Sequence, residues 1–247
     1  MSQPFRLNKE GLINRNKKIS FTFNGKKLFG YEGDTIASAL IANGIHLVGR
    51  SFKYHRPRGF FGAGVEEPNA KLQVEFNGHS EPNVNATEME LVEGLSATSQ
   101  NCWPSVNFDI GAINNFLKMF FPAGFYYKTF MWPKSFWYKI YEPFIRKAAG
   151  LGVASIEKDK ERYEHKFEYC DLLVTGSGPS GLASAYAAAK NGAKVILAED
   201  KPRFGGTLLT DDVSIDNLSG KDWAEKIITE LKSMPNVTVK NRSQVFG

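Results

Sequence analysis

Apolar and polar residues alternate along KISFTFNGKKLFGYEG (18–33), where Ile19, Phe21 and Phe23 occupy every second position. This period of two is typical of a strand with one buried face. The alternation is interrupted at Asn24-Gly25, a pair that favours a tight hairpin turn. The stretch therefore predicts two antiparallel strands joined by that turn.

A helix is predicted next, because TIASALIANGI (35–45) carries apolar residues at helical spacing. Asp34 or Thr35 is expected to cap its N-terminus and Gly44 its C-terminus. AKLQVEF (70–76) predicts a further strand, and MELVEG (89–94) a final one. A hairpin, a helix and more strands indicate an α+β domain of β-grasp-like order over residues 1–100.

Regular patterning is weak over residues 101–169, but aromatic residues are frequent. The run 116–144 holds 13 of them in 29 residues. Prolines and lysines within it argue against a membrane-spanning helix. We interpret 101–169 as an aromatic-rich connector that is buried between domains or against another subunit. Filling of the chain's own core is the alternative.

Strand and helix patterns alternate from residue 170 onward. They are CDLLVT (170–175), SGLASAYAAAKNGA (180–193), KVILAED (194–200), DWAEKIITELKSM (222–234) and NVTVKN (236–241). This order predicts a parallel sheet, the first half of an α/β Rossmann-type dinucleotide-binding domain over 170–247, truncated after its third strand.

A glycine motif lies between the first strand and helix of that domain, Gly176-Ser177-Gly178-Pro179-Ser180-Gly181. In such motifs the first glycine permits a tight turn, the second lets backbone N–H groups approach phosphate oxygens, and the third lets the helix lie close to the strand. The helix N-terminus then favours the negative charge of a pyrophosphate. We therefore expect a dinucleotide to bind here.

An acidic residue, Glu199, closes the second strand and is expected to accept hydrogen bonds from a ribose. Asp200 beside it would repel a 2′-phosphate, which favours NAD or FAD over NADP, although Lys201 and Arg203 weaken that argument. The pair Gly205-Gly206 and the following Thr207 leave room near the phosphates. The motif alone does not separate NAD from FAD.

Composition narrows the class of protein. A length of 247 residues with 42% hydrophobic and 23% charged residues indicates a globular protein of one or two domains. The N-terminus lacks the apolar region of a secretory signal. Cys102 and Cys170 are far apart and have no ligand-spaced partners, so we expect a reducing, cytoplasmic location and no metal site.

Basic residues concentrate at one end, with 11 Lys and Arg against 3 Asp and Glu in residues 1–64. The run Arg50, Lys53, Arg56 and Arg58 is interleaved with aromatic residues and could bind single-stranded nucleic acid. The near-neutral remainder and the lack of an RNA-binding signature favour an acidic subunit surface or a flavin phosphate instead. We expect neither nucleic acid nor membrane as a partner.

No catalytic residue is predicted. The four histidines, at positions 46, 55, 79 and 165, are scattered and show no triad order. His55 lies between Tyr54 and Arg56, and is expected to be structural or to contact an anion.

The segment 50–87 resembles the plant-type [2Fe–2S] ferredoxin domains fused to many oxidoreductases, which carry a C-x4-C-x2-C run and a distant fourth cysteine. The ligand positions fall near Gly62, Glu66, Asn69 and Thr87, and none is cysteine. Because thiolates hold such clusters, we expect a ferredoxin-like scaffold without its iron–sulfur cluster.

Several runs together resemble the start of the alpha subunits of heterotetrameric sarcosine oxidases. They are NGIHLVGRSFKYHRPRG (43–59), GAGVEEPNA (62–70), PAGFYYKTFMWPKSFW (122–137), YEPFIRKAAGLG (141–152) and CDLLVTGSGPSGLASAYAAAK (170–190). The family's alpha subunit is longer and includes a tetrahydrofolate-binding domain. The resemblance therefore implies that this chain is an N-terminal fragment or a truncated product.

The resemblance implies an oxidoreductase subunit. In the family, sarcosine is oxidised at a flavin in the beta subunit, oxygen becomes hydrogen peroxide, and the one-carbon unit passes to tetrahydrofolate, giving glycine and 5,10-methylenetetrahydrofolate. FAD and FMN lie in or are shared with the beta subunit, and gamma and delta subunits complete the heterotetramer. The alpha subunit holds an NAD that does not turn over.

Carried onto this sequence, the family's NAD site gives Gly176, Gly178, Ser180 and Gly181 at the phosphates and Glu199, Asp200 and Lys201 near the adenosine ribose. Thr207 follows the glycine pair, and Val245 begins the return strand near the adenine. Two alternatives stay open. One is the alpha subunit of a flavin-dependent amino-acid or opine dehydrogenase, and the other is a non-catalytic assembly module. The fragment alone is expected to be inactive.

Overall fold

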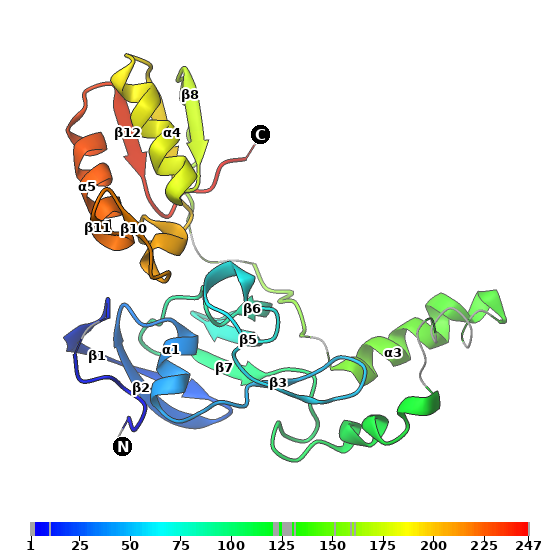
Figure 1. The fold of residues 1–247 in the computed structure, drawn as a ribbon. Coiled ribbons are helices and arrows are strands. Elements are labelled where there is room, and N and C mark those ends of the chain that lie inside the picture. The colour runs from blue at the N-terminus through cyan, green and yellow to red at the C-terminus, as the bar shows by residue number, and fades with distance from the viewer. Residues whose placement is uncertain are drawn as a thin grey trace. The chain divides into compact units, whose positions relative to one another are not determined.

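The structure is a computed structural model, and it describes residues 3–9, 11–120, 124, 130, 132–150, 152–158, 160 and 162–246, with the side chains of 148 and 149 left out. The chain divides into two compact units, residues 1–161 and 162–247. Part of the aromatic run predicted at 116–144 lies outside the described residues. Figure 1 shows the elements of each unit along the chain.

The first unit is built on a five-stranded sheet with the strand order β2-β1-β7-β5-β6. Its strands are β1 (Asn14–Phe23), β2 (Lys26–Glu32), β5 (Lys71–Phe76), β6 (His79–Asn85) and β7 (Ser96–Ser99). A short second hairpin is formed by β3 (Gly49–Arg50) and β4 (Pro57–Arg58).

The predicted hairpin is confirmed. β1 and β2 pair antiparallel, with Phe23 opposite Lys26. Asn24 and Gly25 both have positive φ angles, +48° and +76°. This is the backbone that an Asn-Gly turn between twisted strands requires.

The helix α1 (Ile36–Ala42) also forms where the sequence predicts it. Thr35 rather than Asp34 is its N-cap, and Thr35 and Ser38 form a reciprocal capping box. Its apolar face is buried in the core together with residues of β1, β5 and β7. The fully buried side chains there include Ile36, Leu40, Leu72 and Leu95.

The strand predicted at MELVEG (89–94) is wrong. Its residues form a turn and a single bridge between Glu90 and Thr35, and the last strand of the sheet is β7. Leu91 and Leu95 are both buried, and Gly94 between them has a φ of +79°. The apolar positions thus belong to a loop that folds into the core before β7 pairs parallel to β1.

One further short helix precedes β5, and the others follow β7. They are η1 (Gly64–Glu66), η2 (Ile110–Asn115), η3 (Lys118–Phe120), η4 (Lys134–Phe136), a π-helical turn η5 (Trp137–Tyr141) and α3 (Glu142–Ala149). Many apolar side chains in this part of the first unit are exposed. None of the helices in the described residues is both long enough and apolar enough to span a lipid bilayer.

The second unit contains the predicted alternation of strands and helices. Its elements are β8 (Leu172–Thr175), α4 (Pro179–Lys190), β9 (Val195–Ala198), η6 (Gly206–Leu209), β10 (Ser214–Ile215), β11 (Leu218–Ser219), α5 (Gly220–Ser233) and β12 (Val237–Lys240). The hairpin of β10 and β11 is an addition that the sequence analysis did not predict.

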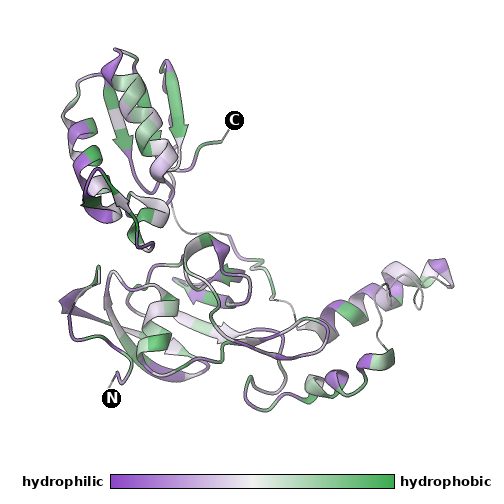
Figure 2. Cartoon of the chain, viewed as in Figure 1, coloured by the Kyte–Doolittle hydropathy of each residue, from purple (hydrophilic) through white to green (hydrophobic). Residues whose placement is uncertain are grey.

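The parallel sheet of the second unit has the order β12-β9-β8. β9 is its central strand and is buried along its whole length. The strands are mostly hydrophobic, whereas α5 alternates hydrophobic and hydrophilic residues (Figure 2). The connections from β8 to β9 and from β9 to β12 step in the same direction across the sheet. Because such crossovers are right-handed, α4 and α5 lie on the same face of the sheet, where they contact each other. The carboxyl ends of the strands are the edge at which such sheets bind ligands.

Candidate nucleotide-binding site

The glycine loop begins where β8 ends. Gly176 has a φ of +88°, a conformation that L side chains rarely adopt. Its N–H donates to the carbonyl of Ala198 at the end of β9, at 2.8 Å. The loop therefore starts as a tight turn beside the carboxyl end of the central strand.

Gly181 sets how closely α4 approaches that turn. A Cβ atom at this position would lie 2.1 Å from the Gly176 carbonyl oxygen, so a larger residue would push the helix away. Gly178 is the N-cap of α4 and Pro179 lies in its first turn. A Cβ at Gly178 would meet nothing within 4 Å. The N-terminus of α4 thus has open space in front of its capping glycine.

Glu199, at the end of β9, is joined to the middle of the glycine loop. Its Oε2 accepts the backbone N–H of Ser177 at 2.8 Å and also the Ser177 hydroxyl. Its Oε1 accepts the N–H of Lys201 at 3.0 Å. Ser177 is fully buried and Glu199 nearly so. The carboxylate is therefore fixed at the loop by three donors.

The second glycine pair packs against the same loop. The N–H of Gly205 donates to the carbonyl and to the hydroxyl of Ser177, both at 3.1 Å. A Cβ at Gly206 would lie 3.0 Å from the Cα of Gly178. Thr207 follows at the start of η6 and is exposed. Gly205 and Gly206 thus bring the 204–207 segment into contact with residues 177 and 178.

The remaining predicted site residues lie on adjoining segments. Asp200 and Lys201 are partly exposed and form an ion pair of 3.3 Å. The N–H of Ser243 donates to the Glu199 carbonyl at 2.9 Å, which brings the residues after β12 next to the end of β9. Val245, two residues later, is about half exposed. Ser180 is exposed in the first turn of α4.

The link between Ser177 and Glu199 was not predicted. Sequence analysis placed both residues at the nucleotide, yet the Ser177 side chain is directed at Glu199 and Gly205. We therefore expect Ser177 to position the carboxylate instead of touching a ligand. The only signal in the sequence is a hydroxyl residue between the first two glycines of the motif.

The basic run 50–58 makes contacts that its charge did not predict. Nε of Arg50 donates to the Val106 carbonyl at 2.9 Å, and Nε of Arg56 donates to Asn115 Oδ1 at 2.8 Å. His55 forms a buried pair with Asp109. These three residues bind the chain's own 101–115 segment, so their first role is to hold that segment to the β3–β4 hairpin.

Two known protein families match successive parts of this chain, one in each of its two units. Residues 16–102 match a family described as a 2Fe-2S iron–sulfur cluster binding domain. Residues 171–235 match a family described as FAD dependent oxidoreductase. The chain is therefore similar to a ferredoxin-like domain followed by a segment of an oxidoreductase with a Rossmann-like parallel sheet.

Curated relatives cover nearly all of this chain. The sarcosine oxidase subunit alpha of Rhizobium meliloti (strain 1021) is 56% identical over 98% of it, and that of Corynebacterium sp. (strain U-96) is 31% identical over its whole length. The chain is thus similar along its length to part of the sarcosine oxidase alpha subunits. It spans only about a quarter of the length of these subunits, 25% and 22% respectively.

A solved structure supports the fold. L-proline dehydrogenase from P. horikoshii matches 97% of this chain and 35% of its own chain, with a TM-score of 0.54 at 18% identity. An identity this low shows a common fold and nothing about the reaction. The sarcosine oxidase resemblance predicted from the sequence is confirmed by the curated relatives.

Proposed function

We propose that this chain is the N-terminal part of the alpha subunit of a sarcosine oxidase complex. In this proposal its second unit binds NAD and its first unit contacts other subunits. The single observation that carries the proposal is the identity of 56% over nearly the whole chain with a sarcosine oxidase subunit alpha. The geometry of the glycine loop supports the nucleotide-binding part.

The complex would convert sarcosine, oxygen and tetrahydrofolate into glycine, 5,10-methylenetetrahydrofolate and hydrogen peroxide. Sarcosine oxidation would take place at a flavin of the beta subunit, and the folate would bind to a part of the alpha subunit beyond these residues. This chain would supply no catalytic group of its own. The buried His55 is already paired with Asp109.

The site would hold the adenosine diphosphate half of the nucleotide. Backbone N–H groups at the start of α4 would face the phosphates, where Gly178 leaves open space. The Glu199 carboxylate, fixed by Ser177, would accept hydrogen bonds from the ribose. NAD and FAD share this half, so these contacts support either one. We propose NAD because the resemblance to the alpha subunits implies it.

FAD is the second candidate, and one specific observation favours it. The family matched by residues 171–235 is described as FAD dependent oxidoreductase. Analysis of the nucleotide that the purified protein carries distinguishes the two candidate cofactors. FAD would be seen by its absorbance near 450 nm, and NAD by an enzymatic cycling assay after acid extraction.

Contacts to partner subunits are supported by an apolar surface of the first unit. Its members lie within residues 103–120 and are each at least half exposed: Trp103, Phe108, Ile110, Ile113, Phe116, Met119 and Phe120. Exposed apolar groups of this size and number are typical of a protein interface. Arg50, His55 and Arg56 hold the segment in place. We propose a partner subunit as its occupant, since the curated relatives are themselves named as subunits.

The nucleotide proposal is tested by titrating the full chain, freed of bound nucleotide, with NAD, NADP, FAD and ADP-ribose in a calorimeter. NAD and ADP-ribose are expected to bind, and NADP more weakly because Glu199 and Asp200 repel its 2′-phosphate. The matched variant is Gly178→Ala, whose φ of −64° accepts alanine and whose new methyl group enters the open space.

Loss of binding in a Gly178→Ala protein that melts like the parent chain supports the site. Equal binding by the two proteins contradicts it. If FAD binds more tightly than NAD, the site is retained and FAD replaces NAD as the proposed cofactor.

The subunit proposal is tested separately, by co-expressing the complete alpha subunit carrying Phe116→Ser and Phe120→Ser with the beta, gamma and delta subunits. Unchanged assembly would contradict the proposed surface.

A further inference from the structure

The loop 61–70 lies where a ferredoxin-like domain would carry its cluster ligands. It connects β4 to β5 and contains the short helix η1. Counted from Gly62, the spacing C-x4-C-x2-C reaches Glu67 and Ala70. The two positions expected from the sequence, near Glu66 and Asn69, lie one residue earlier. The two glutamates differ in burial, because Glu66 is exposed, whereas Glu67 is 2% exposed.

Four backbone N–H groups of this loop converge on the Glu67 carboxylate. Oε2 accepts the N–H groups of Phe61 and Gly62, both at 2.7 Å. Oε1 accepts those of Asn69 at 2.7 Å and of Ala70 at 3.2 Å. A single side chain therefore accepts hydrogen bonds from N–H groups at both ends of the loop. These hydrogen bonds are strong because their acceptor is charged.

The charge state of Glu67 agrees with this geometry. Burial acts to raise the pKa of the carboxyl group, but the hydrogen bonds from Gly62, Asn69, Phe61 and Ala70 outweigh it and hold the pKa below its ordinary value. Near neutral pH the loop therefore encloses a negative charge. That charge is stabilised by backbone dipoles.

The predicted fourth ligand position is also bonded to the loop. The hydroxyl of Thr87 donates to the carbonyl of Gly64 at 2.6 Å. The N–H of Ala86 donates to the carbonyl of Ala70 at 3.0 Å. The segment after β6 is thus joined to the loop 61–70 by two hydrogen bonds, where a ferredoxin would join them through the cluster.

An iron–sulfur cluster does not fit these residues. Clusters of this kind need thiolate ligands, and the two cysteines of the sequence stand at positions 102 and 170, outside the loop. The part of the chain that the structure describes contains no group of three or more His, Cys, Asp or Glu placed to hold a metal ion. The N–H groups of residues 61, 62, 69 and 70 are already bonded to Glu67.

We propose that the Glu67 carboxylate replaces the cluster as the anion around which the loop 61–70 folds. A cluster is an anionic group that accepts hydrogen bonds from surrounding backbone amides at its sulfur atoms. Glu67 offers negative charge and acceptors to the same kind of donor set without a metal. The first unit is then a metal-free scaffold that carries no electrons.

The test compares Glu67→Gln with the matched control Glu66→Gln in the full chain. One carboxylate oxygen of Glu67 becomes an NH2 group in glutamine. Two backbone N–H groups that now donate to that oxygen would then face another donor. In Glu67→Gln the amide protons of residues 61, 62, 69 and 70 are expected to exchange with deuterium roughly tenfold faster or more, because hydrogen bonds to a charged acceptor are lost. The control should leave these rates unchanged.

Two measurements on the unaltered chain keep the proposal testable if Glu67→Gln does not fold. The amides at 61, 62, 69 and 70 should exchange more slowly than those at 63 and 65 in the same loop. After anaerobic incubation with iron, sulfide and a thiol reductant, the chain should retain neither iron nor the visible absorption bands of a cluster. Cluster assembly, or exchange rates that Glu67→Gln does not change, would overturn the proposal.

Discussion

Ser177 donates both its backbone N–H and its hydroxyl to one oxygen of the Glu199 carboxylate, and the N–H lies 2.8 Å from that oxygen. These two residues come from different parts of the fold, the glycine loop after β8 and the end of β9. The contact joins the part of the site proposed to bind phosphate to the part proposed to bind ribose. The same carboxylate also accepts the backbone N–H of Lys201, at 3.0 Å.

Removing the Ser177 hydroxyl should weaken nucleotide binding. Ser177→Ala keeps the backbone N–H but loses the hydrogen bonds to Glu199 and from Gly205. One such hydrogen bond is worth about 1 kcal/mol, so we expect a decrease in NAD affinity of roughly fivefold to tenfold by calorimetry. Ser233→Ala on α5 removes an exposed hydroxyl and is the control. Equal affinities for Ser177→Ala and the unaltered chain would exclude this role.

The pair of His55 and Asp109 should contribute strongly to the stability of the first unit. Their side chains are 6% and 0% exposed and 2.7 Å apart, and Asp109 Oδ1 also accepts the N–H groups of Trp103 and Gly111. Asp109→Ala leaves the buried His55 and these partly buried N–H donors without their acceptor. We expect a loss of about 3 kcal/mol in the free energy of unfolding, measured by urea denaturation. Asp212→Ala, at an exposed position in a loop, should lower the free energy of unfolding by less than about 0.5 kcal/mol, the usual limit for surface substitutions.

The sequence predicts most strongly those elements whose local pattern agrees with their tertiary role. The Asn24-Gly25 hairpin, α1 with its Thr35 cap and the alternation from β8 to β12 all form as expected. In each case periodicity, caps and turn residues point to one structure. The glycine motif also lies as predicted, between a strand and a helix.

Elements that depend on distant partners were missed. β6 (His79–Asn85) is polar and contains Pro82, which the pattern of a buried strand excludes. It forms because it is the edge of its sheet, where one side needs no partner. The run 89–94 looked like a strand because Leu91 and its neighbours are apolar, but these side chains fill the core from a loop.

Side-chain contacts within the sites were also missed, because they join residues that are distant in the sequence. His55 and Asp109 are 54 positions apart, and Ser177 and Glu199 are 22 apart. Only folding brings the members of each pair together, so no local pattern reveals them. Glu67 was closer to detection, since counting the cluster spacing from Gly62 reaches it directly.

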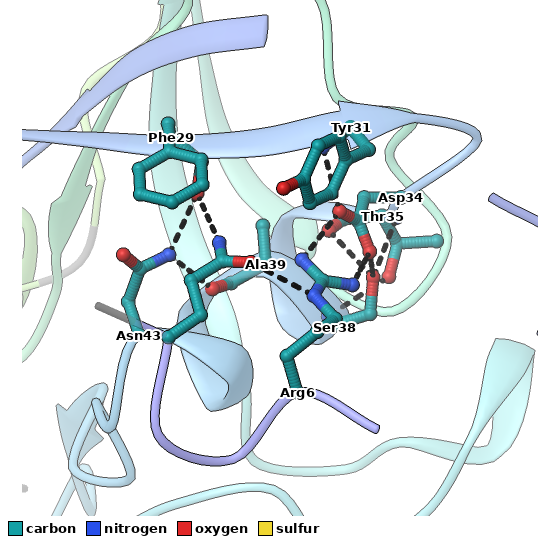
Figure 3. Close-up of polar contacts among 9 residues, drawn as sticks. Arg6, Phe29, Tyr31, Asp34, Thr35, Ser38, Ala39 and Asn43 are labelled. Carbon is teal, nitrogen blue, oxygen red and sulfur yellow. Dashed lines mark hydrogen bonds and ion pairs between the residues drawn. The ribbon is translucent and has the colours of Figure 1, made fainter. Parts of the chain in front are cut away.

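Arg6 should stabilise the first unit through Asp34. Its guanidinium makes two hydrogen bonds to the carboxylate, at 2.8 and 2.7 Å, and Asp34 also accepts from Ser38 and Tyr31 (Figure 3). Asp34 is 1% exposed. Arg6→Ala would leave this charge unpaired, and we expect a loss of about 3 kcal/mol in the free energy of unfolding.

Arg6→Lys is the informative second variant, because a lysine cannot make the paired contact of a guanidinium. Its stability should lie between those of Arg6→Ala and the parent chain. Lys9→Ala, at an exposed position nearby, is the control. A melting temperature of Arg6→Ala equal to that of Lys9→Ala would show that the pair contributes nothing.

Glu67 should make the stability of the first unit depend on pH in the acid range. Its folded pKa lies below the ordinary value of 4.5, so its contribution is fully present above that value and is lost as the pH falls through the folded pKa. The difference in unfolding free energy between the parent chain and Glu67→Gln should therefore be largest near pH 7 and shrink below about pH 4.5. Urea denaturation across this range, followed by tryptophan fluorescence, measures it. Glu66→Gln should show no such trend. A difference for Glu67→Gln that stays constant from neutral pH down to roughly pH 3, well below the ordinary glutamate pKa, would contradict the ionised state assigned to Glu67.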